Sequence, residues 1–314
     1  MKSKKAIGTI CGIAAAICYG MNPLGAMKLY GLGYNTNTVL FFRFGVAWLI
    51  MTVIMLVRRE SFRVTRREFG VVTGLGILFA ISSLALYLSF HHMATGVAST
   101  ILFIYPVLTV IIMAVFFHEH VSKTTIFSIL LALSGVLLLY WGDSTGPLSF
   151  IGVFLVFMSA LSYALYIILV DRSHIQLSAF QINFYVLFYC ALSNLLCSWI
   201  MHDPIQMVHG TTAIFYVIWQ SIIPTIGALV LMVYAAKYVG STTTAILGAL
   251  EPLTAVLIGI IVFHEPFGLR LATGIGLILG AVVLIVLRKS TPEEAVSKKP
   301  IPHKSALQKS AHDK

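Results

Sequence analysis

Charged side chains are scarce in this chain. Asp, Glu, Lys and Arg together account for 10% of its 314 residues, whereas a soluble globular domain carries about 25%. The mean hydropathy is +0.94 and 59% of the residues are hydrophobic, so few polar groups remain to cover a surface in contact with water. The hydrophobic residues also come in runs of about 20, the length that crosses a bilayer. These properties exclude a soluble protein and predict that lipid surrounds the chain.

Cysteine is also rare, and its spacing excludes disulfides within the two close pairs. Cys11 and Cys18 are seven residues apart, as are Cys190 and Cys197. Seven residues of helix separate two side chains by about 10.5 Å along the axis, which is beyond the reach of a disulfide. We therefore interpret all four as small apolar packing residues.

Motifs for ATP hydrolysis and for metal binding are missing as well. No GxxxxGK[ST] segment is present, so a P-loop does not supply the energy for this chain's activity. The HEH triplet at 118–120 and the pair His91–His92 lack the i, i+4 spacing of a helical HExxH site. We expect neither a metal nor another cofactor.

Ten hydrophobic runs with short connections follow one another along the chain. Only helices and closed barrels satisfy every backbone polar group inside hydrocarbon, and runs of this length indicate helices. The first run follows Lys4 and Lys5, and we expect it to be retained as a helix; a cleaved signal peptide is the alternative. The predicted helices span about residues 6–27, 37–57, 69–90, 96–117, 124–141, 148–170, 178–200, 212–235, 241–263 and 269–287.

Lysine and arginine are concentrated on one side of the predicted bundle. With a cytoplasmic N-terminus, all 21 of these residues except Lys28, Arg43 and Arg270 fall in cytoplasmic segments. This bias predicts a multi-pass protein of the cell membrane with both termini in the cytoplasm. The net charge of +10 then reflects topology and attraction to anionic lipid headgroups, and it gives no reason to expect a nucleic-acid partner. Residues 289–314 are rich in charge and poor in large apolar residues, so we expect a disordered basic cytoplasmic tail.

The two halves of the chain resemble each other. The segment YPVLTVIIMAVFFHEH (105–120) aligns with EPLTAVLIGIIVFHEP (251–266), so that Pro106 matches Pro252 and the triplet Phe117–Glu119 matches Phe263–Glu265 at one constant offset. Because each half holds five predicted helices, an odd number, the second half must insert with the opposite orientation. We predict two inverted five-helix repeats, residues 1–142 and 147–288.

This organisation resembles the drug/metabolite transporter superfamily, and in particular its EamA-type family. The resemblance rests on FFRFGVAWL (41–49), on LGALEPLTAVLIGIIVFHE (247–265) and on the glycine-rich last helix of each half (130–140 and 274–287). It covers nearly all of the chain before Arg288. It implies an all-α integral membrane protein of ten transmembrane helices, with the fifth and tenth at the periphery and the other eight around a cavity. Members of that family handle amino acids, metabolites and drugs, so the resemblance does not identify the solute.

One acidic and one basic residue are predicted at membrane depth. Glu251 lies ten positions into the ninth run, about 15 Å from its start, and Arg43 lies about 9 Å below the outer surface. A charge at such a depth costs about 2.5–3.5 kcal/mol unless it is partnered or neutralised. We expect the two side chains to line a polar cavity that holds a charged or zwitterionic solute or a coupling proton. A structural ion pair between the second and ninth helices is the alternative.

Four prolines are also predicted inside the membrane: Pro23, Pro106, Pro224 and Pro252. Each removes one helical hydrogen bond and frees the carbonyl four residues earlier. Interrupted helices line the binding sites of transporters, although a lone proline is also tolerated as a simple kink. Because Pro106 and Pro252 occupy equivalent positions in the two halves, we assign them a role as hinges or in the cavity wall. For Pro23 and Pro224 both interpretations stay open.

Neutral polar and aromatic side chains supply the remaining candidates for the cavity wall. Amides are costly in lipid and should face inward, although hydrogen bonds between helices would explain them equally well, and aromatic residues more often serve packing. An aromatic-rich, sparsely charged cavity favours a modest-sized, partly apolar solute such as an amino acid or a related metabolite. The candidates are Tyr19, Asn22, Tyr87, Tyr105, Tyr163, Tyr166, Asn183 and Gln220.

The sequence therefore predicts a secondary transporter that exports or exchanges a small solute by alternating access around a cavity at the membrane midplane. Protonation of Glu251 would couple transport to a proton gradient, and facilitated diffusion is the alternative. A passive channel and a membrane-embedded enzyme are the competing functions. An enzyme would need a catalytic dyad or a metal constellation at one depth, and one acid beside one arginine is too little for common hydrolytic schemes.

Overall fold

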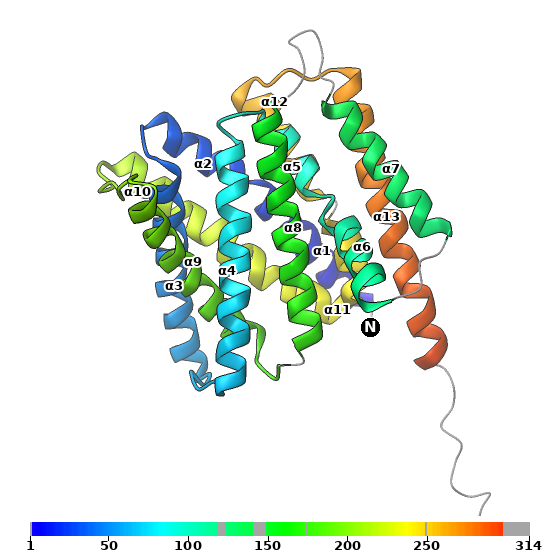
Figure 1. Ribbon diagram of the computed structural model, residues 1–314. Helices are drawn as coiled ribbons and strands as arrows, with labels where there is room; N and C mark the ends of the chain where they lie inside the picture. Colours follow the sequence, from blue (N-terminus) through cyan, green and yellow to red (C-terminus); the bar gives the residue numbers. More distant parts are fainter. Residues whose placement is uncertain (1, 119–122, 141–148, 174, 249, 298–314) are drawn as a thin grey trace, which may run out of the picture.

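The computed structural model describes residues 2–118, 123–140, 149–173, 175–248 and 250–297. Every regular element in these ranges is a helix (Figure 1), as the long apolar runs predict. Seven helical segments are long and apolar enough to cross a membrane, and three shorter apolar helices accompany them: Ile126–Leu139, Leu250–Phe263 and Leu269–Leu284. The all-α membrane class is confirmed, whereas ten crossings and cytoplasmic termini stay predictions.

Several of the predicted runs correspond to one continuous helix each, and others are interrupted. The first run is divided into α1 and α2, the fourth into α5 and α6, and the eighth contains a π-helix, η1. The elements are α1 (Lys2–Gly20), α2 (Asn22–Gly31), α3 (Thr36–Arg58), α4 (Arg66–Ser89), α5 (Thr95–Leu102), α6 (Tyr105–Phe117), α7 (Lys123–Tyr140), α8 (Phe150–Ser173), α9 (Ala179–Ile200), α10 (Thr211–Ser221), η1 (Ile222–Gly227), α11 (Ala228–Gly248), α12 (Leu250–Phe263) and α13 (Leu269–Ser297).

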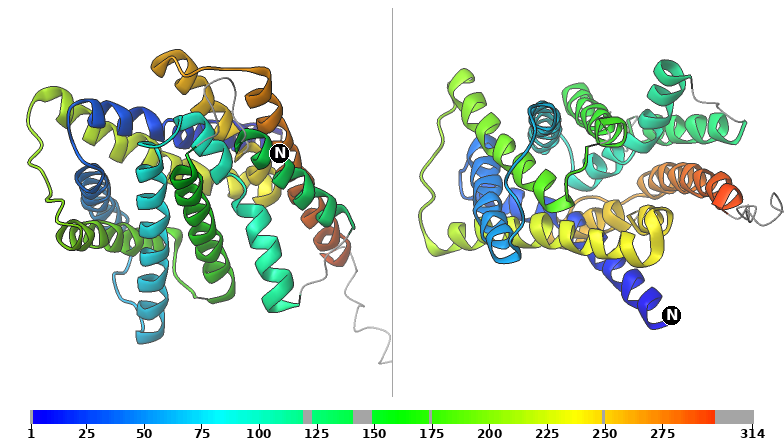
Figure 2. Two further views of the ribbon diagram at one scale, coloured as in Figure 1. Left: turned by 45° about the horizontal axis from the view of Figure 1, so that its top comes forward. Right: turned by 90° about the horizontal axis from the view of Figure 1, so that it is seen from below.

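Helices from the two halves of the chain pack against each other in a regular pattern. Five of the most extensively packed pairs are α1 with α11, α4 with α8, α3 with α9, α5 with α12 and α7 with α13. In each half the first helix packs against the third of the other half, and the second, fourth and fifth pack against their own counterparts. The pair α7 and α13 forms one edge of the bundle, and α3 with α9 lies toward the opposite edge (Figures 1 and 2). Such an exchange is expected for halves related by a pseudo-two-fold axis.

The helix ends follow the same pattern. Among the described residues, four non-glycine residues have a positive φ, and each lies within two residues after the end of a helix. Arg59 follows α3 and His202 follows its partner α9, whereas His118 follows α6 and His264 follows α12. Left-handed residues terminate helices because they turn the chain away from the helix axis. The two halves therefore stop their second and fourth helices in the same way. Glu119, next to His118, lies outside the described residues.

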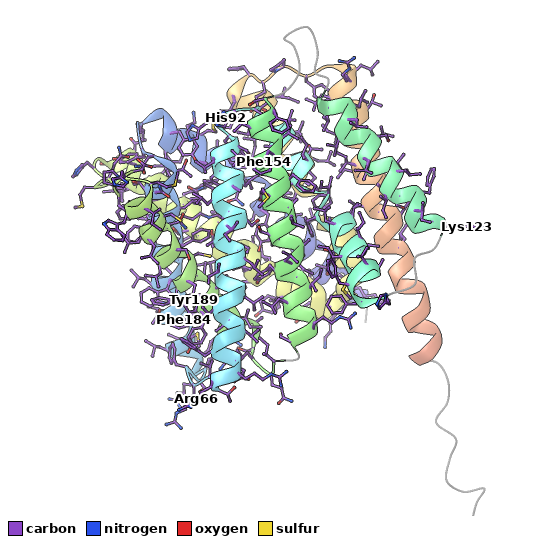
Figure 3. All side chains as sticks on the ribbon, in the orientation of Figure 1. Arg66, His92, Lys123, Phe154, Phe184 and Tyr189 are labelled. Atoms are coloured by element: carbon purple, nitrogen blue, oxygen red, sulfur yellow. The ribbon has the colours of Figure 1, made fainter. Side chains whose placement is uncertain are left out.

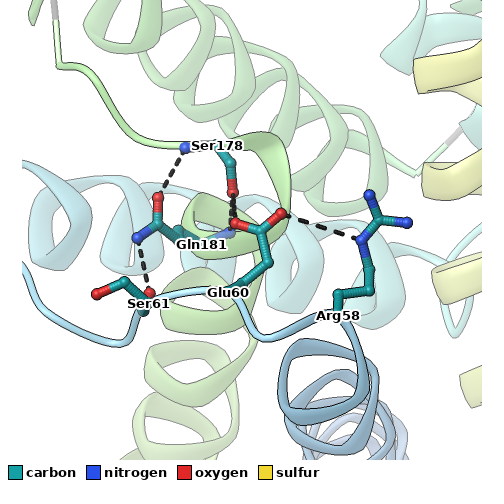
Figure 4. A network of polar contacts seen from close by, with 5 residues as sticks. All are labelled: Arg58, Glu60, Ser61, Ser178 and Gln181. Carbon is teal, nitrogen blue, oxygen red and sulfur yellow. Dashed lines mark hydrogen bonds and ion pairs between the residues drawn. The ribbon is translucent and has the colours of Figure 1, made fainter.

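The two ends of the bundle can be recognised from α4, which runs from Arg66 to a turn that contains His92 (Figure 3). At the Arg66 end, the segment after α3 contacts the start of α9 (Figure 4). There Ser178 Oγ donates to Glu60 Oε2 at 3.0 Å and Gln181 Nε2 donates to Ser61 O at 2.7 Å. This network joins the two halves at the Arg66 end.

At the His92 end, the segment before α3 contacts the segment after α9. Asn35 Nδ2 donates to Asp203 Oδ1 at 2.6 Å, and Asn37 Nδ2 donates to Asp203 Oδ2 at 3.1 Å. The backbone N–H of Asn35 also donates to Gln206 Oε1 at 2.9 Å. Polar contacts therefore join α3 and α9 to each other at both ends of the bundle.

Two helices differ from their predicted limits. We predicted a connection near residues 236–240, but α11 continues through it, because the segment holds no proline and contains residues that tolerate helix, such as Ala236 and Lys237. The last helix, α13, continues beyond Arg288 to Ser297, so residues 289–297 extend this helix where we predicted the tail. Residues 298–314 lie outside the described residues.

Gly20, the last residue of α1, allows a close approach between α1 and α12. A Cβ atom at this position would lie 2.5 Å from the carbonyl oxygen of Glu251 and 2.5 Å from Cβ of Thr254. Only glycine fits at this position, because any side chain would displace the start of α12. This contact brings Tyr19 beside the helix that carries Glu251.

We predict that Gly20→Ala destabilises the protein by about 1–3 kcal/mol, because overpacking forces the backbone to shift. Gly45→Ala in α3 is the matched control, since a Cβ there meets no atom within 4 Å, and it should be neutral or stabilising by up to about 1 kcal/mol. Thermal unfolding of both variants in one detergent measures the difference. Equal unfolding midpoints would contradict the close approach of α1 and α12.

Candidate functional site

The helix interruptions lie close together in the interior of the bundle. The helix α12 packs against α1, α2 and α5, and η1 packs against α1 and α10. The α1–α2 break at Met21, the α5–α6 break at Phe103–Ile104, the π-helix and the start of α12 are therefore neighbours. These breaks carry Tyr19, Asn22, Tyr105, Gln220 and Glu251, which brings five of the predicted site residues into one region.

Prolines account for the positions of these breaks. Pro23 and Pro106 lie in the first turns of α2 and α6, where a missing N–H costs nothing because helix starts leave that group unpaired. Pro224 lies within η1, and Pro252 lies in the first turn of α12. Each proline therefore stands where a helix restarts or changes its hydrogen-bond register, and Pro106 and Pro252 mark equivalent restarts.

The π-helix supplies partners for its own freed backbone. Pro224 leaves the carbonyl of Gln220 without its helical donor, and Thr225 Oγ1 donates to that oxygen at 2.9 Å. Ser221 Oγ donates to the carbonyl of Arg43 at 2.9 Å. Hydroxyl groups thus satisfy carbonyls that hydrocarbon would leave unpaired, and they fasten η1 to α3 beside Arg43.

Arg43 of α3 is buried among neutral groups. Its side chain is 5% exposed. Its Nε donates to Thr225 Oγ1 at 2.9 Å, and one terminal nitrogen, Nη1, donates to the hydroxyl of Tyr87 at 2.6 Å. The guanidinium also lies over the rings of Phe44 and Tyr87, 5.0 Å and 5.5 Å from their centroids. These contacts fix the orientation of Arg43 through the fork of donors that a guanidinium presents.

Tyr87 joins two of the interrupted segments to α3. Its hydroxyl donates to Asn22 Oδ1 at 3.4 Å and accepts from Gln220 Nε2 as well as from Arg43. Gln220 Nε2 also approaches the carbonyl of Asn22 at 3.5 Å. The other amide atom, Gln220 Oε1, is buried and has no hydrogen-bond partner in the described part of the protein. A polar cluster of Asn22, Arg43, Tyr87, Gln220 and Thr225 therefore occupies the meeting point of α2, α3, α4 and η1.

The predicted alternative of an ion pair between Arg43 and Glu251 is wrong. Within the described residues, Arg43 has no carboxylate at ion-pair distance, and the one ion pair found joins Arg58 and Glu60 at 4.0 Å. The two side chains occupy different parts of the interior, because Arg43 is held by Thr225 and Tyr87. Its positive charge is therefore stabilised by neutral dipoles and ring faces alone.

Glu251 lies among tyrosines in the first turn of α12. The side chain is partly buried, and it interacts electrostatically with Tyr19, Tyr105 and Tyr163. Tyr19 also interacts electrostatically with Arg43, so this tyrosine is within electrostatic reach of both the basic and the acidic residue. The site therefore has an arginine region and a glutamate region, with Tyr19 near both.

Aromatic rings form a continuous wall between these regions. The ring of Tyr105 lies 4.7 Å from that of Tyr163, which stacks on Tyr166 at 5.7 Å. Phe79 of α4 lies 5.4 Å from Tyr166 and 6.1 Å from Phe44, the neighbour of Arg43. The sequence analysis missed Phe44 and Phe79, because apolar side chains in an apolar helix carry no signal that separates a wall from packing.

Asn183 is the predicted site residue that does not join this cluster. It lies on α9 and is partly buried, and the polar contacts found among the described residues do not involve it. Helical spacing places it on the same face as Leu187 and Cys190, and Cys190 interacts electrostatically with Arg43. Asn183 thus faces inward nearer the Arg66 end than the cluster does.

Two hollows on the outside of α9 are distinct from this interior site. A groove of about 640 Å³ is lined by Leu195, Trp199, His202 and neighbouring residues, and a smaller one of about 200 Å³ lies between α4 and α9 beside Asn194. Apolar residues dominate both linings, as expected of a surface that faces lipid. Within the described residues, His, Cys, Asp and Glu side chains do not gather into a group able to hold a metal ion.

Comparison with known proteins identifies related chains. The model of the EamA-like transporter family matches residues 6–141 and 150–287. An "uncharacterized transporter" of Archaeoglobus fulgidus is 27% identical over 86% of this chain and 94% of its own length. The uncharacterized transporters YcbK and YetK of Bacillus subtilis are 22% and 24% identical, over 90% and 92% of this chain and 94% and 90% of their own lengths. A solved crystal structure shares the fold with a TM-score of 0.65 at 17% identity, covering 90% of this chain and 98% of that chain.

We predict that Tyr87→Phe lowers the free energy of unfolding by about 1–3 kcal/mol, because it leaves buried donors of Arg43 and Gln220 without an acceptor. Tyr166→Phe is the matched control: Tyr166 contributes ring contacts to the wall, and the contacts described for it include no hydrogen bond. Thermal unfolding in one detergent compares the two. Similar midpoints for both variants would show that the Tyr87 hydroxyl does not hold the polar cluster together.

Proposed function

The chain belongs to the EamA-like transporter family, and on this basis we propose that it is a secondary transporter that moves a small metabolite across the cell membrane by alternating access. Family membership and the names of its relatives indicate a multi-pass membrane transporter and point away from an enzyme. The solute, the direction and the mechanism are our inference from the interior site.

The observation that carries this proposal is that Arg43 is buried and has no carboxylate partner among the described residues. A guanidinium is always charged, and a charge inside the bilayer is retained where it serves a pathway or binds a partner. The Nη2 nitrogen is not used in the hydrogen bonds of Arg43, which involve Nε and Nη1. A carboxylate of the solute would find an unoccupied donor there and would compensate the charge.

The aromatic wall supports a modest-sized, partly apolar solute. Stacked and edge-on rings of Tyr105, Tyr163, Tyr166 and Phe79 offer apolar faces, while tyrosine hydroxyls offer hydrogen bonds beside Glu251. An amino acid or a related metabolite matches both the arginine region and this wall. Glu251 would receive either an amino group of the solute or a coupling proton, since it has no cationic partner at ion-pair distance in the described residues.

The packing of the two halves supports alternating access. We propose inverted repeats, residues 1–142 and 147–288, whose exchanged conformations open the site to one side at a time. The exchanged helix pairs and the matched helix ends are what such repeats require. The restarts at Pro106 and Pro252 would then act as equivalent hinges on the two sides of the site. Export and exchange are the transport modes that we propose, with a proton gradient as the energy source.

We predict that Glu251→Gln and Arg43→Ala each reduce solute counterflow by about tenfold or more, since each removes a charge-assisted interaction inside the site. The solute is first selected by thermal-shift screening of amino acids and related metabolites. Counterflow of the labelled solute is then measured in proteoliposomes. Arg63→Ala, at an exposed position, and Glu68→Gln, in the capping box of α4, are the matched controls at the Arg66 end and should keep normal rates.

Normal counterflow by both well-folded site variants would remove Glu251 and Arg43 from the mechanism. Flux without saturation or trans-stimulation, accompanied by electrical conductance, would replace the carrier by a passive channel. These outcomes differ from a folding defect, because the unfolding midpoint of each variant is measured in the same preparation.

A further inference from the structure

Glu265 connects the two half-helices that extend from the site to the His92 end. The carboxylate accepts hydrogen bonds at the start of α5: Oε1 from the backbone N–H of Thr95 at 2.7 Å and from Thr95 Oγ1 at 2.8 Å, and Oε2 from the N–H of Gly96 at 3.2 Å. Glu265 follows α12, so the contact crosses between the halves of the chain.

The half-helix α5 depends on this carboxylate. It has only eight residues, and its N-cap residue, Ala94, makes no side-chain capping bond. The first N–H groups of a helix need acceptors and carry partial positive charge. Glu265 supplies both an acceptor and a negative charge, so α5 is capped by a residue that follows α12, in the other half of the chain.

The backbone around Glu265 is shaped for this contact. His264 has a φ of 54° and ends α12, and the N–H of Glu265 donates back to the carbonyl of Gly259 at 2.9 Å. The side chain then returns over Gly259, where any Cβ would overlap Oε2. A Cβ on Gly96 would lie 2.9 Å from Cα of Val256. Glycine on both helices thus permits the carboxylate to reach α5.

Both half-helices extend from residues of the site. The chain passes from α5 through the break at Phe103–Ile104 to Tyr105, and α12 begins beside Glu251. Separation of α5 from α12 would open a path from the His92 end to the tyrosines around Glu251. The contact of Glu265 holds these two helices together.

We propose that Glu265 is a positioning residue for transport, a clasp that closes the His92 end of the pathway by capping α5 across the halves. The inference rests on the proposed function, because a clasp has meaning only if the site opens to alternate sides. The clasp releases when the carboxylate leaves α5, and the cost of uncapping α5 keeps this end closed in the conformation described.

Accessibility of a reporter cysteine tests the clasp without a known solute. The four native cysteines are replaced, Tyr105→Cys is introduced, and a membrane-impermeant maleimide is applied separately to each side of sealed vesicles. His92→Cys and Arg66→Cys calibrate the two sides. Glu265→Ala should raise the labelling rate from the His92 side by about tenfold or more, and it should not raise labelling from the Arg66 side.

A second capping glutamate provides the matched control. Glu68 caps α4 through Thr65 in a local capping box at the Arg66 end, so Glu68→Ala removes a helix cap without touching α5. It should leave labelling from the His92 side unchanged. Glu265→Gln keeps the side-chain shape and loses the charge, and it should produce a smaller rise than Glu265→Ala. This variant also preserves the test if the alanine protein does not fold.

Unchanged labelling from the His92 side in folded Glu265 variants would overturn the clasp, and so would equal rises from both sides, which indicate loosened packing. Counterflow by the chain with Tyr105 and Glu265 intact separates the two proposals. Normal counterflow by that chain with unchanged labelling of the Glu265 variants refutes the clasp and leaves the transporter intact. Changed labelling together with no counterflow by the intact chain refutes the transport proposal, and the role of Glu265 in transport falls with it.

Discussion

A helix that is interrupted inside a bilayer exposes backbone carbonyl and amide groups, and hydrocarbon supplies no partner for them. This chain meets that requirement by placing its interruptions next to one another. Thr225 donates to the carbonyl that Pro224 leaves free on Gln220, and the amide of Gln220 approaches the carbonyl of Asn22 in the next interrupted segment. Polar side chains are therefore concentrated at one place in an apolar bundle. Arg43 and Tyr87 are retained in the interior because this cluster provides their partners.

The contacts between the halves at the two ends of the bundle are separate from the polar cluster in the interior. Each end carries its own contacts between the halves, through Asp203 at the His92 end and through Glu60 at the Arg66 end (Figure 4). Such contacts are short and polar, so they can break and reform in water at modest cost. In the transport cycle that we propose, the packed interruptions would stay together. A bundle of this kind can change which end is open while the polar interior is preserved. The contact of Glu265 with α5 is one of these polar contacts at an end of the bundle.

Sequence alone could predict the membrane class, reveal the internal similarity and select most residues of the candidate site. Glu251, Arg43 and the tyrosines were found because polar or aromatic groups are conspicuous in apolar runs, and the prolines located the interruptions. The continuity of α11 was missed, because the break between two hydrophobic runs at 236–240 indicated a connection, although this segment contains no proline and its residues tolerate helix. The separation of Arg43 from Glu251 was also missed, because depth along two helices does not specify their rotation. Phe79 and Glu265 make contacts with residues of the other half of the chain, and a pattern along the sequence does not show which distant residues meet.

In the arrangement that we propose, the second half of the chain lies inverted relative to the first, so that equivalent helix interruptions meet around one interior site. Arg59, after α3, and Arg270, in the first turn of α13, should then face opposite sides of the membrane. Cysteines placed at these two positions in a cysteine-free chain can be labelled with an impermeant thiol reagent in sealed, oriented vesicles. Labelling of Arg59→Cys and Arg270→Cys from opposite sides is the predicted result. Labelling of both from the same side would contradict the inverted arrangement and the site built on it.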